Sequence, residues 1–255
     1  MNNNIIVVNN LFKRYKDHVA VDHISFDVRQ GEIFGLLGVN GAGKTSTLEI
    51  IETLRKKDGG QVLVNGMSID ERAADIKRII GVQLQYAGYY PGLNLTELIR
   101  YYADLYNIDV DPALLLATMG LSKKATAKYE EMSGGQKQSF SLLLSVINKP
   151  LIVFLDEPTT GLDPNARLNL WRLIRALRDK GMTIVVTTHY MEEAEAICDR
   201  VAIMNAGKIM ELGTPASLID KLLGKGFKSQ KPVKAASLED VFIDLTGYNP
   251  EDIER

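Results

Sequence analysis

The spacing of hydrophobic and polar positions changes several times along the chain. Apolar and polar residues alternate over 24–28, which is typical of a half-buried strand, and the first 30 residues together favour β-structure. Residues 33–37 form a short apolar run suited to a strand that is buried on both faces. A glycine-rich turn and a helical stretch from about residue 43 to residue 55 follow it. This part therefore predicts strands that lead into a strand–turn–helix unit.

The pattern becomes helical in the middle of the chain and mixed after it. Between residues 93 and 149 strand signals disappear, and apolar residues recur at helical spacing, with a second helix expected from about Ser133 to before Pro150. Strands at 151–155, 183–188 and 201–204 then alternate with helices at 164–179 and 191–197. This alternation implies a parallel sheet with right-handed crossovers, so we expect an α/β core with an inserted helical lobe.

These changes of pattern also predict the domain boundaries. We expect residues 1–92 and 150–223 to form one core and residues 93–149 to form the helical lobe. Residues 224–255 are expected to form a short lysine-containing linker and a closing helix from Ser237 to about Leu245.

Composition narrows the possible functions. The chain has 30 Lys and Arg against 32 Asp and Glu, and its net charge of −2 argues against a nucleic-acid partner bound through a global positive field. Cys198 is the single cysteine, which excludes an intramolecular disulfide and favours a reducing compartment. No stretch approaches the roughly 18 apolar residues of a membrane span. We therefore expect any membrane role to depend on a partner.

Residues 38–45 fit the phosphate-loop pattern G-x-x-x-x-G-K-[ST]. Glycines allow backbone N–H groups to wrap a phosphate chain, and the helix that begins beside Gly43 adds its positive end. Lys44 would place a charge on the β- and γ-phosphates, and Thr45 would offer a hydroxyl to Mg²⁺. The predicted nucleotide-binding residues of this loop are Gly38, Asn40, Gly41, Ala42, Gly43, Lys44, Thr45 and Ser46.

Two carboxylates end the buried strand that begins at residue 151. A parallel strand delivers its last residues to the carboxyl edge of the sheet, where ligands of α/β folds bind. Asp156 can hold Mg²⁺ through water, and Glu157 can polarise an attacking water as a general base. A solvated strand end would show the same two residues, so they indicate a catalytic site only in combination with the phosphate loop.

The tetrapeptide Ser133–Gln136 has the composition of an anion-binding helix start. Ser133 is a typical N-cap residue, and the two glycines that follow leave the first backbone N–H groups of the helix uncovered. An ordinary capped helix would start in the same way, so this segment indicates a phosphate site only together with the phosphate loop and the two carboxylates.

In this arrangement the chain resembles the ATP-binding subunits of ABC transporters over roughly residues 5–215, with Met132–Gln136 as the signature. The resemblance implies a RecA-like P-loop NTPase core with an N-terminal antiparallel β subdomain and an inserted α-helical signature subdomain. It implies hydrolysis of ATP with Mg²⁺ at the cytoplasmic face of a membrane, beside a separate permease chain. It also implies a head-to-tail dimer, in which each ATP lies between one phosphate loop and the partner's Ser133, Gly134, Gly135 and Gln136.

The resemblance assigns roles to further residues. Tyr15 matches an aromatic residue that stacks on adenine, although strand packing would also account for it, and Asp163 lies in the loop that crosses the dimer interface. Gln85 matches the glutamine that reaches Mg²⁺ and the attacking water, with Gln83 as a nearby alternative. The implied catalytic residues are Glu157, His189, Gln85 and Lys44, and the implied metal ligands are Thr45, Gln85 and Asp156. His18 and His23 are expected to be structural.

Finer features point to one group within the family. The stretches after residues 161 and 188 resemble ATPases of ABC-2-type exporters, which handle drugs, antibiotics, peptides, lipids, polysaccharides or ions. The tail at 237–247 resembles the end of ATPases of the daunorubicin-resistance type, although a surface helix that packs on the core would also account for it. Ser139 stands where the family usually has arginine, which puts the packing of the signature helix in question. A soluble ABC ATPase without a transport role is the alternative, and a P-loop kinase or GTPase would leave the signature unexplained.

Tyrosines gather between residues 86 and 106. Tyrosine buries a large area with few torsions and keeps a polar end, so it is favoured at interfaces. We expect several of these rings to line a socket for the permease beside Gln85, with packing of the helical lobe as the rival explanation. The tyrosines concerned are Tyr86, Tyr89, Tyr90, Tyr101, Tyr102 and Tyr106.

Overall fold

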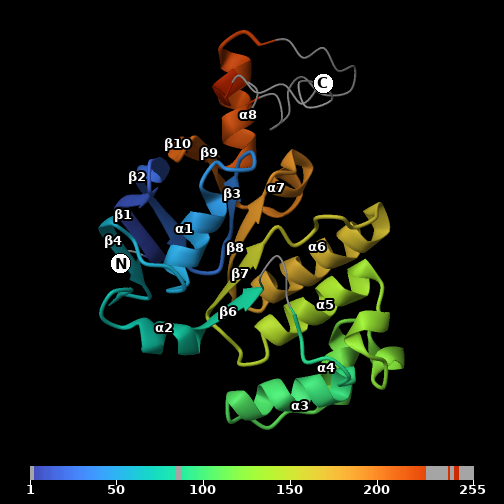
Figure 1. Cartoon of the computed structure of the whole chain (residues 1–255). Coiled ribbons are helices and arrows are strands. Elements are labelled where there is room, and N and C mark those ends of the chain that lie inside the picture. The colour runs from blue at the N-terminus through green and yellow to red at the C-terminus, as the bar shows by residue number, and fades with distance from the viewer. Residues whose placement is uncertain (1–2, 84–87, 228–240, 242–243, 247–255) are drawn as a thin grey trace.

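A computed structural model describes residues 3–83, 88–227, 241 and 244–246 (Figure 1). Its N-terminal part is an antiparallel sheet with the strand order β2-β1-β4-β5. The four strands are β1 (Asn4–Tyr15), β2 (His18–Arg29), β4 (Gly59–Val64) and β5 (Met67–Ser68). Asn65 and Gly66 both have positive φ angles, of 49° and 74°, which is the backbone of a tight hairpin turn between β4 and β5.

A six-stranded sheet forms the core, in the order β10-β9-β3-β8-β7-β6. Its strands are β3 (Ile33–Leu37), β6 (Ile80–Gln83), β7 (Ile152–Asp156), β8 (Thr183–Thr188), β9 (Arg200–Asn205) and β10 (Lys208–Gly213). The pairs are parallel except for β9 with β10. Strands β3, β7 and β8 are buried at every position, as their apolar runs predict.

Each face of this sheet has its own cover. Phe34 and Leu36 point to the face that packs against helix α1 (Lys44–Ile51) and the antiparallel sheet. Ile33 and Leu37, one residue out of phase, point to the opposite face. That face packs against α6 (Pro164–Asp179), α7 (Met191–Ile197) and α8 (Pro215–Gly224).

The inserted lobe has a separate hydrophobic cluster. It contains α3 (Leu95–Leu105), α4 (Pro112–Thr118) and α5 (Gly134–Ser145), with short 3₁₀ turns at Ser122–Lys124 and Tyr129–Glu131. Asn94, Asp111 and Ser133 cap the three α-helices through their side chains. Leu98, Phe140 and Leu143 are among the fully or almost fully buried residues of the cluster. Figure 1 shows the lobe at the side of the core near β6.

Most predicted elements are present, with a few differences. The bounds of α6 and α7 match the predicted ranges, whereas α1 ends at Ile51 because Thr53 adopts a left-handed φ of 63°. Helix α2 (Ala73–Ile79) and strands β6 and β10 were not predicted from the pattern. In the tail, Val241 and residues 244–246 are helical, and the rest of the predicted closing helix lies outside the described residues.

Candidate functional site

A cavity of about 650 Å³ opens at the carboxyl edge of the six-stranded sheet. The strand register explains its position, because Leu37 pairs with Thr188 and Asp156 pairs with Thr187. The segments that follow β3, β7 and β8 therefore meet at one place. The cavity is lined by Tyr15, His18, Ala20, Asn40, Gly41, Gly43, Lys44, Thr45, Ser46, Glu157, Thr160 and His189.

The phosphate loop needs its glycines because the chain passes close to backbone carbonyls. A Cβ at Gly38 would lie 2.4 Å from the carbonyl oxygen of Met204, and a Cβ at Gly43 would lie 2.2 Å from that of Ala20. Gly43 is also the N-cap of α1, with a φ of 100° and no side-chain cap. The first N–H groups of α1 are thus left for an anion.

Lys44 lies inside this loop and is almost fully buried. Its Nζ donates to the carbonyl oxygens of Gly38 at 2.7 Å and Val39 at 3.1 Å. Burial lowers the pKa of Lys44, while the nearby carboxylates of Glu157 and Asp156 oppose that shift. The loop therefore fixes a cation at the bottom of the cavity.

Asp156 is held by two hydroxyl groups. Thr45 Oγ1 donates to Asp156 Oδ2 at 3.2 Å, and Thr187 Oγ1 donates to Oδ1. Burial raises the pKa of Asp156, and the two hydrogen bonds oppose the rise. Among the described residues, His, Cys, Asp and Glu form no cluster of three or more that could hold a metal ion. The adjacent Thr45 hydroxyl and Asp156 carboxylate are the kind of oxygen donors that suit Mg²⁺ when phosphates and water supply the remaining ligands.

Glu157 lies between three polar side chains. Its Oε1 is 3.6 Å from Lys44 Nζ and 3.2 Å from His189 Nδ1, and its Oε2 accepts a hydrogen bond from Thr160 Oγ1 at 3.2 Å. The backbone of Glu157 has a left-handed φ of 47°, which is unfavourable for a residue with a Cβ. Its N–H donates to Thr187 Oγ1 at 3.0 Å, which anchors the turn. A carboxylate, an ammonium and an imidazole thus converge at the cavity wall.

Some residues that line the cavity were not predicted from the sequence. His18, which was expected to be structural, lines the cavity, whereas His23 stacks on Phe12 with ring centroids 4.8 Å apart. Tyr15 lines the cavity, and its hydroxyl donates to Ser46 Oγ at 3.4 Å. Ala20 and Thr160 were also missed. The position of Thr160, three residues after Glu157, was the available signal, because a turn there can return a hydroxyl to the carboxylate.

Gln85 lies outside the described residues, so its predicted role stays a prediction. Gln83, the alternative, ends β6 and is 3% exposed. Its side-chain amide donates to Gln138 Oε1 of α5, and it does not line the nucleotide cavity. Gln83 therefore connects the core to the lobe.

The signature residues lie in a different place from the phosphate loop. Ser133 and Gln136 form a reciprocal capping box at the start of α5 and line a separate groove of about 540 Å³, together with Gly135 and Asp163. No residue of this groove lines the cavity around Lys44. One chain therefore carries two predicted ATP-contacting surfaces that do not meet within it.

The signature helix packs with Ser139 in the place where the family usually has arginine. Ser139 Oγ donates to the carbonyl oxygen of Gly135 at 2.9 Å, and α5 continues to Ser145 without a break. A Cβ at Gly135 would lie 2.7 Å from the Cβ of Ala166 in α6. Glycine at this position thus allows close contact between α5 and α6.

The sequence of this chain is similar to those of known ATP-binding proteins of transporters. Residues 21–160 match the profile of the family described as ABC transporter. Nod factor export ATP-binding protein I of Burkholderia orbicola is 39% identical over 220 residues, which cover 84% of this chain and 72% of that protein. Linearmycin resistance ATP-binding protein LnrL of Bacillus subtilis is 36% identical over 220 residues, which cover 84% and 71% of the two chains.

Solved structures agree with the fold. An ATP-binding subunit of an ABC transporter superposes with a TM-score of 0.80 at 26% identity, covering 94% of this chain and 99% of that one. A dimeric ATP-binding cassette bound to ADP and phosphate superposes with a TM-score of 0.74 at 24% identity, covering 82% and 98%. The predicted P-loop core with a β subdomain and a helical insert is confirmed. Within the described ranges, no helix is both long and apolar enough to span a membrane.

Proposed function

Because the chain belongs to the ABC transporter family, as an ATP-binding and ATP-hydrolysing subunit, we propose that it energises an exporter through a separate permease at the cytoplasmic face of a membrane. The observation that carries this proposal is the convergence of Lys44, Glu157 and His189 in one cavity. Lys44 Nζ and His189 Nδ1 both approach the same oxygen of Glu157, Oε1. That arrangement suits phosphoryl transfer to water.

Each side chain of the cavity has its own role in the hydrolysis of ATP. The phosphate loop and Lys44 hold the β- and γ-phosphates of ATP, and Glu157 accepts a proton from the water that attacks the γ-phosphorus. His189 approaches Glu157 from the end of β8, where it can contact the γ-phosphate. Thr45 and Asp156 would hold Mg²⁺, which neutralises charge on the phosphate oxygens when bound. Tyr15 at the cavity wall supplies a ring for adenine.

The separation of the two ATP-contacting surfaces supports a head-to-tail dimer. Ser133 and Gly134 are exposed at the start of α5, and the uncovered N–H groups there favour a phosphate. A second subunit, rotated by a half turn, would place its own Ser133–Gln136 segment over the cavity around Lys44. Closure would exclude water and complete the charge around the transferred phosphoryl group.

The relatives support export as the direction of transport. One is named for Nod factor export and another for linearmycin resistance, and both share more than two thirds of their length with this chain. A soluble ABC ATPase is the alternative function. Capture of the tagged chain from the membranes of its host tests the choice: a membrane protein with several spans, recovered in near-equal amount, supports the exporter, and recovery from the soluble fraction alone contradicts it.

A mixing experiment tests the shared site. Lys44→Ala damages the phosphate-loop side of each site, and Ser133→Arg blocks the signature side, so each variant alone should lose ATP hydrolysis. A mixed dimer contains one intact site, made from the phosphate loop of the Ser133→Arg chain and the signature of the Lys44→Ala chain. Mixing the two variants should therefore restore hydrolysis.

The matched control combines two defects of the same side. Lys44→Ala mixed with Glu157→Gln leaves no intact site in any dimer, so hydrolysis should stay low. Recovery in this control, or none in the first mixture while both variants are folded, would contradict the head-to-tail arrangement. Thermal unfolding of each variant establishes that it is folded.

A further inference from the structure

One face of helix α6 contacts the segment that carries His189. Arg167 and Trp171 are four residues apart in α6 and therefore lie on the same face, and Arg175 extends this row by one more turn. All three side chains contact residues between His189 and the end of α7. We call residues 189–193 the histidine segment. Its position relative to the nucleotide cavity thus depends on side chains of α6.

Trp171 makes the buried contact of this face. Its Nε1 donates to Glu193 Oε1 at 3.0 Å, and Trp171 is 8% exposed whereas Glu193 is fully buried. A buried hydrogen bond to a carboxylate is costly to break, because the acceptor would be left without water. This bond fixes the first turn of α7 against α6, four residues after His189.

Arg167 makes a second contact, with the residue next to His189. Its guanidinium carbon lies 5.1 Å from the centroid of the Tyr190 ring. Its Nη1 is also 3.6 Å from Glu192 Oε2, but that glutamate side chain is 82% exposed, whereas the arginine side chain is 22% exposed. Water screens an exposed ion pair, while a partly desolvated cation keeps its attraction to an aromatic face. Tyr190 is therefore the main partner of Arg167.

Tyr190 connects this contact to His189. The two rings have centroids 4.1 Å apart, and His189 Nδ1 is 3.2 Å from Glu157 Oε1. The N–H of Tyr190 donates to Thr188 Oγ1 at 2.9 Å, which fixes the backbone around the histidine. A row of side chains therefore runs from Arg167 of α6 through both rings to the carboxylate proposed as the general base.

The orientation of the imidazole matters because its two nitrogens have different roles. The group that one ring nitrogen faces determines which nitrogen carries the proton. When Nδ1 of His189 faces Glu157, Nε2 is the nitrogen that remains for a phosphate oxygen. A ring that lost its contact with Tyr190 could turn away from Glu157 and exchange these roles.

We propose that Arg167 is a positioning residue for hydrolysis: its guanidinium holds the ring of Tyr190, which in turn holds the imidazole of His189 with Nδ1 toward Glu157. The proposal rests on the proposed function, in which His189 and Glu157 act on ATP and water. It adds a residue that does not line the nucleotide cavity and yet controls the geometry inside it.

Nitrogen-15 NMR of the full chain tests the orientation without measuring activity. The chain has three histidines, so selective labelling of histidine gives few signals, and His189→Gln identifies those of His189. Arg167→Gln should shift the ring nitrogen signals of His189. Those of His23, which stacks on Phe12, should stay in place. Unchanged His189 signals in Arg167→Gln would overturn the proposal.

Steady-state hydrolysis of ATP tests whether the orientation affects turnover. Arg167→Gln should lower kcat roughly three- to thirtyfold and leave the KM for ATP within about twofold, because the phosphate loop is untouched. Arg175→Gln is the matched control, since Arg175 lies on the same face of α6 and donates to the carbonyl oxygen of Ala196, near the other end of α7. We expect this control to keep the original kcat. An equal loss in both variants would mean a general loosening of α7 and would overturn the specific role.

Variants of Tyr190 approach the same contact from its other side. Tyr190→Ala should slow hydrolysis by a factor similar to that of Arg167→Gln, and Tyr190→Phe, which keeps the ring, should restore most of the lost turnover. Adding Arg167→Gln to Tyr190→Ala should have little further effect, because both variants break one row of contacts. Fully additive losses would contradict the row. Thermal unfolding establishes that each variant is folded.

The outcomes separate this proposal from the proposed function. If His189→Ala hydrolyses ATP at the original rate, the role of His189 in the proposed function is wrong, and the positioning role of Arg167 fails with it. If His189→Ala is slow but Arg167→Gln changes neither the His189 signals nor kcat, the positioning role alone is wrong and the proposed function stands.

Discussion

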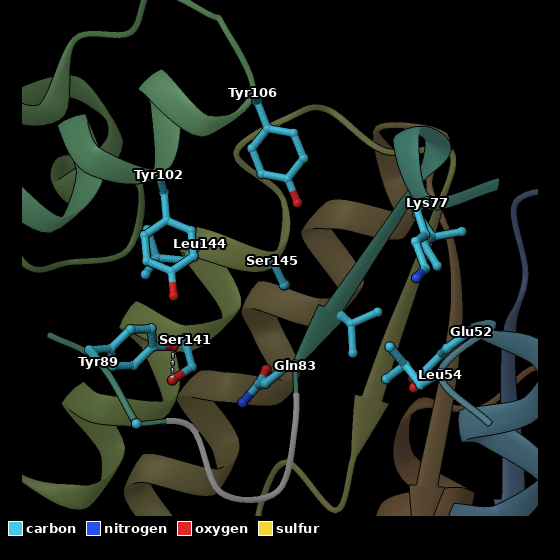
Figure 2. Close-up of a pocket in the computed structure, with 13 residues that line it drawn as sticks. Glu52, Leu54, Lys77, Gln83, Tyr89, Tyr102, Tyr106, Ser141, Leu144 and Ser145 are labelled. Carbon is cyan, nitrogen blue, oxygen red and sulfur yellow. Dashed lines mark hydrogen bonds between the residues drawn. The ribbon is translucent and has the colours of Figure 1, made fainter. Parts of the chain in front are cut away.

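The nucleotide cavity and a second hollow of about 390 Å³ between the helical lobe and the core, which we call the lobe–core groove (Figure 2), differ in how they hold buried carboxyl groups. In the cavity, Thr45 and Thr187 bond Asp156, and Thr160 bonds Glu157. In the groove, Glu52 is as deeply buried, and neither of its carboxylate oxygens has a hydrogen-bond partner among the described residues. The first site is organised by groups of the same chain before its substrate arrives, as phosphoryl transfer requires. In the second, burial raises the pKa of Glu52 to about 8, so its carboxyl group keeps its proton near neutral pH.

The largest expected effect lies in the cavity. Glu157→Gln should slow ATP hydrolysis about 10²–10⁴-fold, the usual contribution of a general base, while nucleotide binding persists. Steady-state phosphate release and binding of a fluorescent ATP analogue measure the two properties. Glu211→Gln is the control, because Glu211 lies on β10, pairs with Lys221 of α8 and does not line the cavity. Normal turnover in Glu157→Gln would show that another group accepts the proton.

The next effect concerns stability at the groove. The pKa of Glu52 is raised from 4.5 to about 8 in the folded chain, so the folded state holds its proton more tightly than the unfolded state. Its contribution to stability is therefore fully present below pH 4.5 and is lost as the pH rises toward 8. At about 1.4 kcal/mol per pH unit, the loss amounts to several kcal/mol.

Glu52→Gln should remove that loss. The variant and the original chain should have similar free energies of unfolding near pH 5, and the variant should become the more stable one by several kcal/mol at pH 8. Urea unfolding at pH 5, 6.5 and 8 measures the difference. A difference that does not change with pH would mean that Glu52 titrates normally.

A smaller effect of opposite sign is expected where a buried carboxylate has a partner. Trp171 Nε1 donates to Glu193 Oε1 at 3.0 Å, and Glu193 is fully buried. Trp171→Phe removes the donor and should lower the free energy of unfolding by about 1–3 kcal/mol. Urea unfolding near neutral pH measures this loss of stability. The double variant Trp171→Phe, Glu193→Gln is measured beside it, because it removes the donor and the charge of the acceptor together. Equal stability of Trp171→Phe and the original chain would show that the bond contributes nothing.

The smallest effect tests the tyrosines that are predicted to line a socket for the permease. Tyr106 lines the groove and is 43% exposed, so Tyr106→Ala should leave the unfolding temperature nearly unchanged. Loss of one partly exposed ring from the predicted permease socket, about 0.5–1 kcal/mol, should weaken recovery of the membrane partner two- to fivefold. Tyr90→Ala is the comparison, since Tyr90 does not line the groove. Equal recovery by both variants and the original chain would remove Tyr106 from the interface.

The nucleotide cavity was largely predictable because its chemistry is local. The phosphate loop, the Asp156–Glu157 pair and His189 each follow a buried strand, and parallel strands bring such positions to one edge. His18 escaped prediction because it reaches the cavity from a neighbouring sheet, whose packing a one-chain pattern does not contain. Gln85 and most of the tail lie outside the described residues, and their roles stay predictions.

The groove was not predictable, because segments that are far apart in the sequence form it. Glu52 sits in the chain as one polar residue after the apolar stretch of α1, and nothing in its neighbours marks it as buried. It lines one hollow with residues of α2, β6 and the lobe, all of which lie far from it in the sequence. The tyrosine cluster was visible, but the division between lining and packing rings required the fold.

The close approach of Gly135 to Ala166 limits the size of the residue at both positions. A Cβ at 135 would meet the Cβ of Ala166 at 2.7 Å, so a larger residue at either position would separate α5 from α6. Asp163 caps α6 by accepting from the N–H of Ala166 at 2.9 Å, and it lines the signature groove. A lineage that enlarged residue 166 would thereby displace both the signature and the loop beside it. Selection on the signature would therefore extend to Ala166, which lies on a neighbouring helix and lines the same groove.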